Sequence, residues 1–76
     1  MAKGKVDNII RRLRFEHGEM TQKALAEKVG VTRQTIMAIE AAKYAPSLEL
    51  AFMIALTFER PLEEVFSFQP EGRDQA

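Results

Sequence analysis

Apolar residues recur at helical spacing along most of the chain. In the first segment, four residues follow one another at intervals of three or four positions: Val6, Ile10, Leu13 and His17. This spacing places all four on one face of a helix. Asp7 or Asn8 can serve the N-terminal end of that helix, and Gly18 is suited to the position just beyond its last turn. The pattern predicts a first helix over residues 6–17.

Two shorter helices are predicted next, each opened by a threonine. The Thr21 hydroxyl can cap a helix over residues 22–29 that ends at Gly30, and Thr32 can cap a helix that runs to about Ala41. Five residues are expected to face the core from these two helices: Leu25, Ala26, Val29, Ile36 and Ile39.

Proline and serine mark the start of the second half of the chain. Pro46 disfavours helix at the preceding residue, and Ser47 can cap a helix over residues 48–57. Its expected inward stripe consists of Leu48, Ala51, Ile54, Ala55 and Phe58. A last short helix fits residues 61–66, because Pro61 suits a first turn.

No segment is recognised as a β-strand by alternation of apolar and polar residues. The predicted fold is therefore all-α, a compact five-helix domain over residues 6–68. Residues 1–5 are expected to form a flexible basic arm, and residues 69–76 a disordered C-terminal tail.

The charge distribution changes the interpretation of a chain whose net charge is zero. Residues 1–44 carry nine basic and five acidic residues, whereas residues 45–76 carry two basic and six acidic residues. The halves are therefore +4 and −4. This asymmetry favours one face suited to a polyanion, although an uneven solvated surface would give the same count.

The segment over residues 21–40 has the spacing of a helix-turn-helix motif, with Gly30 accepting the sharp turn. If Ile36 and Ile39 are buried, the residues that point away from the core are Gln34, Met37, Ala38 and Ala41, with Arg33 on the flank near Met37. Arginine can pair with guanine and glutamine with adenine through two hydrogen bonds each, and methionine can contact a thymine methyl group. We therefore expect Arg33, Gln34 and Met37 to read base edges.

The chain resembles the Cro/C1-type helix-turn-helix family, the XRE regulators related to phage repressors, from about Asn8 to Phe66. The resemblance is carried by Thr21-Gln22, Leu25-Ala26, Val29-Gly30-Val31-Thr32, Gln34-Thr35-Ile36, Ile39-Glu40 and Pro46-Ser47-Leu48. It implies a lambda-repressor-like fold, binding to double-stranded DNA and transcriptional regulation.

The same resemblance implies roles for individual residues. Base-reading positions are occupied by Arg33, Gln34 and Ala38, and the alanine cannot form a hydrogen bond through its side chain. Phosphate contacts are assigned to Gln22, Thr32, Thr35, Lys43 and Tyr44.

One departure from the family concerns Ala41 and Ala42, where many members have Asn-Gly. Either Ala42 adopts a left-handed conformation, at a cost of about 1 kcal/mol, or the helix runs slightly longer. Either outcome alters how Lys43 and Tyr44 meet the phosphates.

Glu40 lies at the edge of the predicted buried face of its helix, and Arg14 lies at the corresponding edge of the first helix. A partly buried carboxylate needs a partner, so an Arg14–Glu40 ion pair is expected. The family resemblance implies the same structural pair.

Several apolar residues are left over for a possible dimer interface: Phe52, Met53, Leu56, Phe66 and Phe68. Core packing could absorb some of them. The alternative is a homodimer whose two-fold symmetry places the recognition helices about 34 Å apart, one DNA turn, on a palindromic operator. A rival interpretation is an antitoxin-like module that keeps the fold but mainly binds a protein partner.

The chain lacks the residues that several other classes of protein require. The chain has no cysteine and one histidine, which excludes a thiol nucleophile, a cysteine zinc site and a multi-histidine site. No Gly-rich phosphate loop or carboxylate cluster is present, so we expect no enzyme activity, cofactor or metal. The N-terminus lacks the apolar segment of a secretory signal, and the longest apolar stretch is too short to span a membrane. We therefore expect a cytoplasmic protein, a repressor that acts as a dimer.

Overall fold

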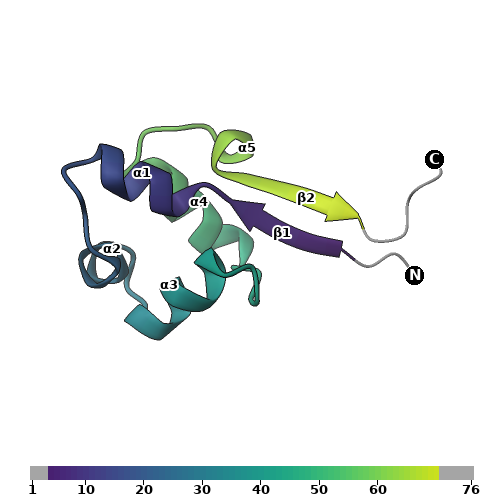
Figure 1. Cartoon of the computed structure of the whole chain (residues 1–76), viewed down its shortest axis with the longest axis horizontal. Helices are drawn as coiled ribbons and strands as arrows, with labels where there is room; N and C mark the ends of the chain where they lie inside the picture. The colour runs from purple at the N-terminus through teal and green to yellow at the C-terminus, as the bar shows by residue number, and fades with distance from the viewer. Residues whose placement is uncertain (1–3, 71–76) are drawn as a thin grey trace.

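The computed structural model describes residues 4–70. The elements are β1 (Gly4–Asn8), α1 (Ile10–Glu16), α2 (Gln22–Val29), α3 (Arg33–Glu40), α4 (Leu48–Thr57), α5 (Leu62–Val65) and β2 (Phe66–Pro70). Figure 1 shows the five helices gathered in one cluster, from which the two strands project to one side. The parts of the predicted arm and tail in residues 1–3 and 71–76 lie outside the described residues.

The predicted helix starts at Thr21, Thr32 and Ser47 are confirmed. Each of these side-chain oxygens accepts a hydrogen bond from the backbone N–H three residues ahead. The cap satisfies one of the donors that the first helical turn leaves without a partner.

The all-α prediction is wrong in one respect, because β1 and β2 form a two-stranded antiparallel sheet. Val6 pairs with Phe68 and Asn8 with Phe66, so Val6 belongs to a strand and not to the first helix. Gly4 and Lys5 also belong to β1, where we expected a flexible arm, and the predicted tail contributes Gln69 and Pro70 to β2.

Asn8 is the last residue of β1 and lies two residues before the start of α1. Its Oδ1 accepts a hydrogen bond from the backbone N–H of Ile10 at 3.1 Å, and its Nδ2 donates to the carbonyl oxygen of Ile39 at 2.8 Å. The backbone N–H of Ile9 donates to the carbonyl oxygen of Val65 at 3.0 Å, which ties the same point to the end of α5. These bonds fix the chain between the end of β1 and Ile10, and α1 begins at Ile10, later than the apolar spacing predicts.

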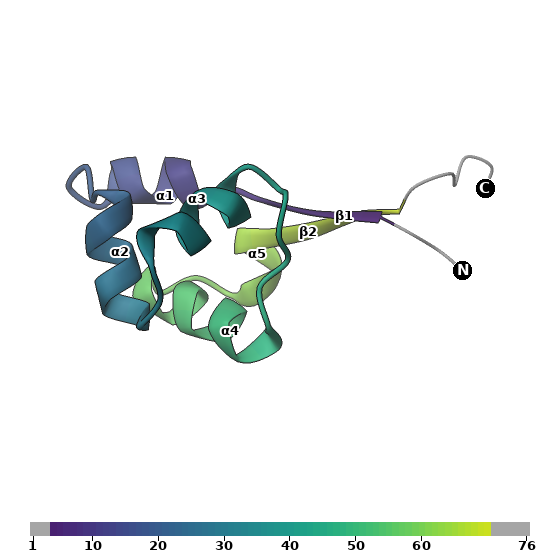
Figure 2. The same cartoon turned by 90° about the horizontal axis from the view of Figure 1, so that it is seen from below.

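The core lies between the helices, and every helix contributes to it. Its fully buried large side chains are Ile10, Leu13, Leu25, Ile36, Ile39, Ile54, Phe58 and Val65. Figure 2 shows α1 and α4 on opposite sides of the cluster, with α3 between them on the near face. This arrangement presents α3 to the outside along one face of the molecule.

The predicted inward stripe of α4 is wrong at its first residue. Leu48 is 66% exposed, and Leu50 is buried in its place. Because α4 is apolar on nearly all sides, hydrophobic spacing could not define which of the two leucines faces inward.

Candidate nucleic-acid interface

The turn between α2 and α3 fixes the angle between the two helices. Gly30 ends α2 in a left-handed conformation with φ of 78°, which glycine adopts without a steric penalty. The backbone N–H groups of Gly30 and Val31 both donate to the carbonyl oxygen of Ala26, at 2.8 and 3.0 Å. Ala26 is itself buried, which allows close approach of the two helices. Residues 21–40 thus form two packed helices joined by a tight turn.

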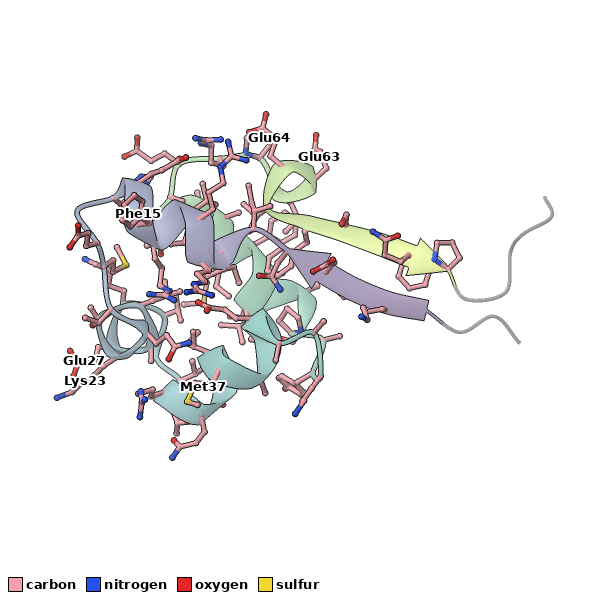
Figure 3. All side chains as sticks on the ribbon, viewed as in Figure 1. Phe15, Lys23, Glu27, Met37, Glu63 and Glu64 are labelled. Atoms are coloured by element: carbon pink, nitrogen blue, oxygen red, sulfur yellow. The ribbon has the colours of Figure 1, made fainter. Side chains whose placement is uncertain are left out.

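The outer face of α3 carries the predicted base-reading side chains. Ile36 and Ile39 are buried, whereas Arg33, Gln34 and Met37 are exposed. In Figure 3 the Met37 side chain points away from the helical cluster, on the side opposite Glu63 and Glu64. Ala38, the remaining predicted reader, is half-buried. The exposed face can therefore offer two hydrogen-bonding side chains and one apolar one.

Arg14 and Glu40 are brought together between α1 and the C-terminal end of α3. The Nε and Nη2 atoms of Arg14 donate to the two carboxylate oxygens of Glu40, at 2.7 and 3.0 Å. The third contact of the guanidinium is the carbonyl oxygen of Met20, at 2.8 Å from Nη1. The side chains are 15% and 9% exposed, so this two-pronged pair is well shielded from water.

Gln22 is held by the same carboxylate. Its Nε2 donates to Glu40 Oε1 at 3.1 Å, which positions the amide at the N-terminal end of α2. Glu40 therefore links three helices, α1 through Arg14, α2 through Gln22, and its own α3. Any group that binds near Gln22 meets a side chain whose orientation is already fixed.

An open depression lies beside these residues. It is lined by Arg11, Arg14, Thr21, Gln22, Lys23, Arg33 and Glu40. The carboxylate of Glu40 is already engaged by Arg14. Within residues 4–70, Arg11, Lys23 and Arg33 take part in none of the ion pairs, which involve Arg12, Arg14 and Arg60 instead. The depression is therefore positive and suited to an anion.

Arg11 and Lys23 were missed in the sequence analysis. They come from different helices, and only the packing of α1 against α2 and α3 places them around one depression. A partial signal was present, because Arg11 lies three residues before Arg14 and so shares its side of α1.

The loop beyond α3 takes the left-handed alternative considered for Ala42, which has φ of 60°. The backbone N–H groups of Ala42 and Lys43 donate to the carbonyl oxygens of Ile39 and Ala38, both at 2.9 Å. These bonds end the helix sharply and leave Lys43 and Tyr44 exposed directly after it. Lys43 thus places a cation at the C-terminal end of α3, at the opposite end of the helix from Arg33.

The two threonines assigned to phosphate contact lie at the opposite end of α3. The Thr32 hydroxyl accepts from the backbone N–H of Thr35 at 3.2 Å, and the two side-chain oxygens are 3.0 Å apart. Thr32 is exposed and Thr35 is half-buried. The predicted phosphate-contacting residues are therefore distributed over both ends of α3.

The residues assigned to a dimer interface divide into two groups. Phe66 is half-buried and packs against the core. Phe52, Met53, Leu56 and Phe68 remain exposed. Core packing thus accounts for Phe66 and leaves the other four uncovered by residues 4–70.

Two further findings concern only the described part of the chain. None of its helices has the length and hydropathy that a membrane crossing requires. The same residues contain no group of three histidine, cysteine, aspartate or glutamate side chains arranged to hold a metal ion.

Known proteins resemble this chain over most of its length. The helix-turn-helix family model matches residues 10–65. An uncharacterized HTH-type transcriptional regulator of Archaeoglobus fulgidus is 50% identical over 62 residues, covering 82% of this chain and 87% of the relative. One from Methanothermobacter thermautotrophicus is 49% identical over 65 residues, with 84% and 93% covered. The uncharacterized HTH-type transcriptional regulator YgzD of Bacillus subtilis is 45% identical over 65 residues, with 86% and 97% covered. With α2 and α3 forming the motif, this chain belongs to the Cro/C1-type (XRE) helix-turn-helix family of DNA-binding transcriptional regulators.

Proposed function

We propose that this protein is a transcriptional repressor that binds a palindromic operator as a homodimer. The observation that carries the proposal is the exposed face of α3, which has Arg33, Gln34 and Met37 on its surface and free cations at both ends. A helix presented in this way can enter the major groove with its first turn closest to the base edges.

In this proposal the first turn of α3 selects the sequence. Arg33 donates two hydrogen bonds to a guanine, and Gln34 pairs with an adenine, each contact discriminating against a wrong base by about 1–3 kcal/mol. Met37 contacts a thymine methyl group one turn further along. Ala38 contributes shape only, because it has no polar side-chain atom.

The phosphate contacts position α3 in the groove. Gln22, oriented by Glu40, holds a phosphate at one end together with Thr32 and Thr35. Lys43 and Tyr44 hold the backbone at the other end, where the left-handed Ala42 directs the chain away from the helix. These contacts supply affinity that falls with salt and carries no sequence information of its own.

Selection of bound duplexes from a random pool at near-physiological salt tests this proposal. We expect a palindrome whose half-sites lie about one DNA turn apart, because a two-fold dimer presents two equivalent recognition helices. Enrichment of a single unrepeated half-site would contradict the dimeric part of the proposal. No enrichment would contradict sequence-specific binding.

Repression is tested separately by transcription in vitro from a promoter that overlaps the selected operator. Occupancy of the promoter excludes polymerase, so transcript yield should fall as operator occupancy rises. A rise in yield at the same occupancy would identify an activator.

The antitoxin-like alternative is favoured by one observation, the exposed apolar side chains Phe52 and Leu56 on α4. Reversing the charge at Arg33 with Arg33→Glu separates the two functions. It should abolish DNA binding while leaving any protein partner bound to α4.

A further inference from the structure

A groove lies at the C-terminal end of α3, apart from the depression around Gln22. Residues 42–45 of the loop after α3 line it together with residues 4–7 of β1 and residues 69–70 of β2. The family model matches residues 10–65, so the loop belongs to the stretch that defines the family, whereas both strands lie outside it. We call this feature the strand groove. It joins a loop of the motif domain to an element that the motif does not require.

The position of β1 relative to α3 is fixed by Asn8. Its Nδ2 donates to the carbonyl oxygen of Ile39 at 2.8 Å, which attaches the last residue of β1 to the last turn of α3. Figures 1 and 2 show β1 extending outward from this point, beside the loop that follows α3. A strand rises about 3.3 Å per residue, so Lys5 lies about 10 Å along β1 from Asn8. A side chain on β1 is therefore held beyond the end of α3 at a defined place.

The charges around the strand groove are mainly positive. Lys5 from β1 and Lys43 from the loop are both exposed, and neither takes part in the ion pairs within the described part of the chain. Asp7 is the one carboxylate among the lining residues, and it is half-buried. Tyr44 adds a phenol ring that is 49% exposed. Two exposed cations and one hydroxyl therefore border a single open groove, which favours an anion.

Lys5 lies on the polar face of the β1–β2 sheet. Directly opposed residues of an antiparallel pair share a face, and successive pairs alternate between the two faces. The pairs Lys5–Gln69 and Asp7–Ser67 therefore share one face, and Phe68 lies on the other. A lysine on this face can extend its ammonium group without crossing an apolar surface.

The backbone beside Lys5 is covered from the opposite face. A Cβ atom placed on Gly4 would overlap the Phe68 ring, so the ring lies across β1 next to Lys5. This packing holds the strand that carries the lysine in one place relative to the loop after α3. A cation on a preorganised backbone loses less conformational freedom when it binds than one on a free chain end.

A DNA backbone fits the strand groove better than a small free anion. A small ligand is usually enclosed and oriented by a few precisely placed polar groups. Both lysines here are exposed, and none of the charged or polar side chains of residues 4–70 is fully buried. A DNA strand instead carries one phosphate at each step of about 3.4 Å along the helix axis, so cations that stand apart can each meet one. The groove also continues directly from Lys43 and Tyr44, to which the proposed function already assigns the backbone.

We propose that Lys5 binds a DNA phosphate next to those held by Lys43 and Tyr44, so that β1 extends the backbone contact beyond the recognition helix. This inference rests on the proposed function, because it places the duplex along α3. The phosphate lies no more than about three base-pair steps past the end of α3, since three steps of 3.4 Å match the offset of Lys5 along β1. Lys5 adds affinity and fixes the register of the domain, whereas the base edges are read by α3.

Ethylation interference locates the phosphate. The selected operator is ethylated at random phosphates, and the fractions bound by the unmodified protein, Lys5→Gln and Lys43→Gln are compared. With the unmodified protein, ethylation at each contacted phosphate prevents binding. We expect one of these phosphates to become indifferent to ethylation in Lys5→Gln and a neighbouring one in Lys43→Gln. An unchanged set of interfering phosphates in Lys5→Gln would overturn the proposal.

Salt dependence on a duplex of random sequence gives a second test, in which two neighbouring charges have opposite effects. Lys5→Gln should reduce the slope of log affinity against log salt by about 1, as expected for one lost phosphate contact. Asp7→Asn should raise the affinity, because it removes a negative charge from the same groove and keeps the oxygen that accepts from the backbone N–H of Asn8.

Arg60→Gln is the matched control for these measurements. It removes the same charge from a side chain that is paired with Glu16 and Glu64, so the slope should stay nearly unchanged. Circular dichroism verifies that each variant is folded. An unchanged slope in Lys5→Gln, or an affinity that does not rise in Asp7→Asn, would contradict a phosphate at Lys5.

Inorganic phosphate distinguishes a DNA backbone from a small free anion. It is added to the unmodified protein and to Lys5→Gln at constant ionic strength, and the backbone amide resonances of β1 and residues 42–45 are followed by NMR. We expect no saturable shift in either protein. A saturable shift that Lys5→Gln removes would assign the strand groove to a free anion and overturn the proposal.

The same variants separate failure of this inference from failure of the proposed function. If an operator is selected and Lys5→Gln binds it with the salt slope of the unmodified protein, the inference is wrong and the proposed function stands. If no sequence is enriched and Lys5→Gln still lowers the slope on random duplexes, sequence-specific binding is wrong and the Lys5 contact stands.

Discussion

Glu40 Oε1 accepts hydrogen bonds from Arg14 Nη2 at 3.0 Å and from Gln22 Nε2 at 3.1 Å, so one carboxylate orients both a cation and an amide in the depression that Arg33 also lines. The recognition helix is therefore attached to α1 and α2 by polar contacts as well as by its buried isoleucines. Within residues 4–70 the Gln22 side chain forms no other hydrogen bond, so its position depends on Glu40. In the proposed function Gln22 holds a phosphate, so Glu40 would link the stability of the fold to phosphate binding.

Removing Arg14 from the shielded Arg14–Glu40 pair should destabilise the fold. Arg14→Ala leaves Glu40 poorly compensated and should lower the free energy of unfolding by about 2–4 kcal/mol, near the range for a broken buried pair. Arg12→Ala breaks an exposed pair with Glu16 and should cost less than about 1 kcal/mol. Urea denaturation measures both. Equal losses would contradict the structural role of Arg14.

The left-handed turn after α3 should be improved by glycine. Ala42 has φ of 60°, where an L-residue with a Cβ is strained. Ala42→Gly should raise the free energy of unfolding by about 0.5–1 kcal/mol, because relief of strain exceeds the added entropy of the unfolded chain. Ala41→Gly is the control, since Ala41 has φ of −82° and gains no such relief. A destabilised Ala42→Gly variant would be inconsistent with the left-handed turn.

A methyl group at Gly4 should disturb the β1–β2 sheet selectively. Gly4→Ala forces the Phe68 ring off the neighbouring strand, so the paired amide hydrogens of β1 and β2 should exchange faster with solvent. Amide hydrogens of α2 and α3 should keep their protection, because the sheet and the helical core can open separately. Ser67→Ala, on the face of the sheet opposite Phe68, should leave the sheet unchanged. Equal rates of amide exchange in the two variants would show that the position of the Phe68 ring does not depend on the absence of a side chain at Gly4.

Arg11 and Lys23 should contribute to affinity without choosing sequence. Alanine at either position should weaken binding to all duplexes alike and reduce the slope of log affinity against log salt by about 1, as expected for one lost phosphate contact. Arg12→Ala removes an equal charge already paired with Glu16 and should have a smaller effect. Binding isotherms at several salt concentrations distinguish these cases. A changed sequence preference in Arg11→Ala would assign it a base contact.

The helix caps and the turn between α2 and α3 can be predicted from the sequence, because they depend on residues close together in the chain. Thr21, Thr32 and Ser47 cap helices through atoms only three residues away, so their position along the chain is sufficient. The left-handed Gly30 is predictable for the same reason. The motif and the outer face of α3 follow from these caps and from two buried isoleucines.

The β1–β2 sheet depends on residues far apart in the chain and has little local sequence signal. β1 has Val6 as its only strongly apolar residue, and its partner Phe68 lies at the opposite end of the chain. An isolated helical spacing from Val6 to Ile10 was therefore the stronger pattern, and it led to the wrong element. The exposure of Leu48 was mispredicted for a related reason, since only contacts with other helices decide which side of an apolar helix is buried. The grouping of Arg11 with Lys23 is likewise a product of tertiary packing.

The central claim is that the outer face of α3 reads DNA bases. Its most direct test compares the DNA sequences selected from one pool of duplexes by Arg33→Ala, Gln34→Ala and the unmodified protein. The matched control is Arg60→Ala, because Arg60 forms ion pairs with Glu16 and Glu64 and lies away from α3. If the outer face of α3 reads DNA, Arg33→Ala relaxes preference at one guanine position and Gln34→Ala at one adenine position, while Arg60→Ala leaves the selected sequence unchanged. If the two α3 variants select the same sequence as the unmodified protein, the face assigned to base reading is the wrong one.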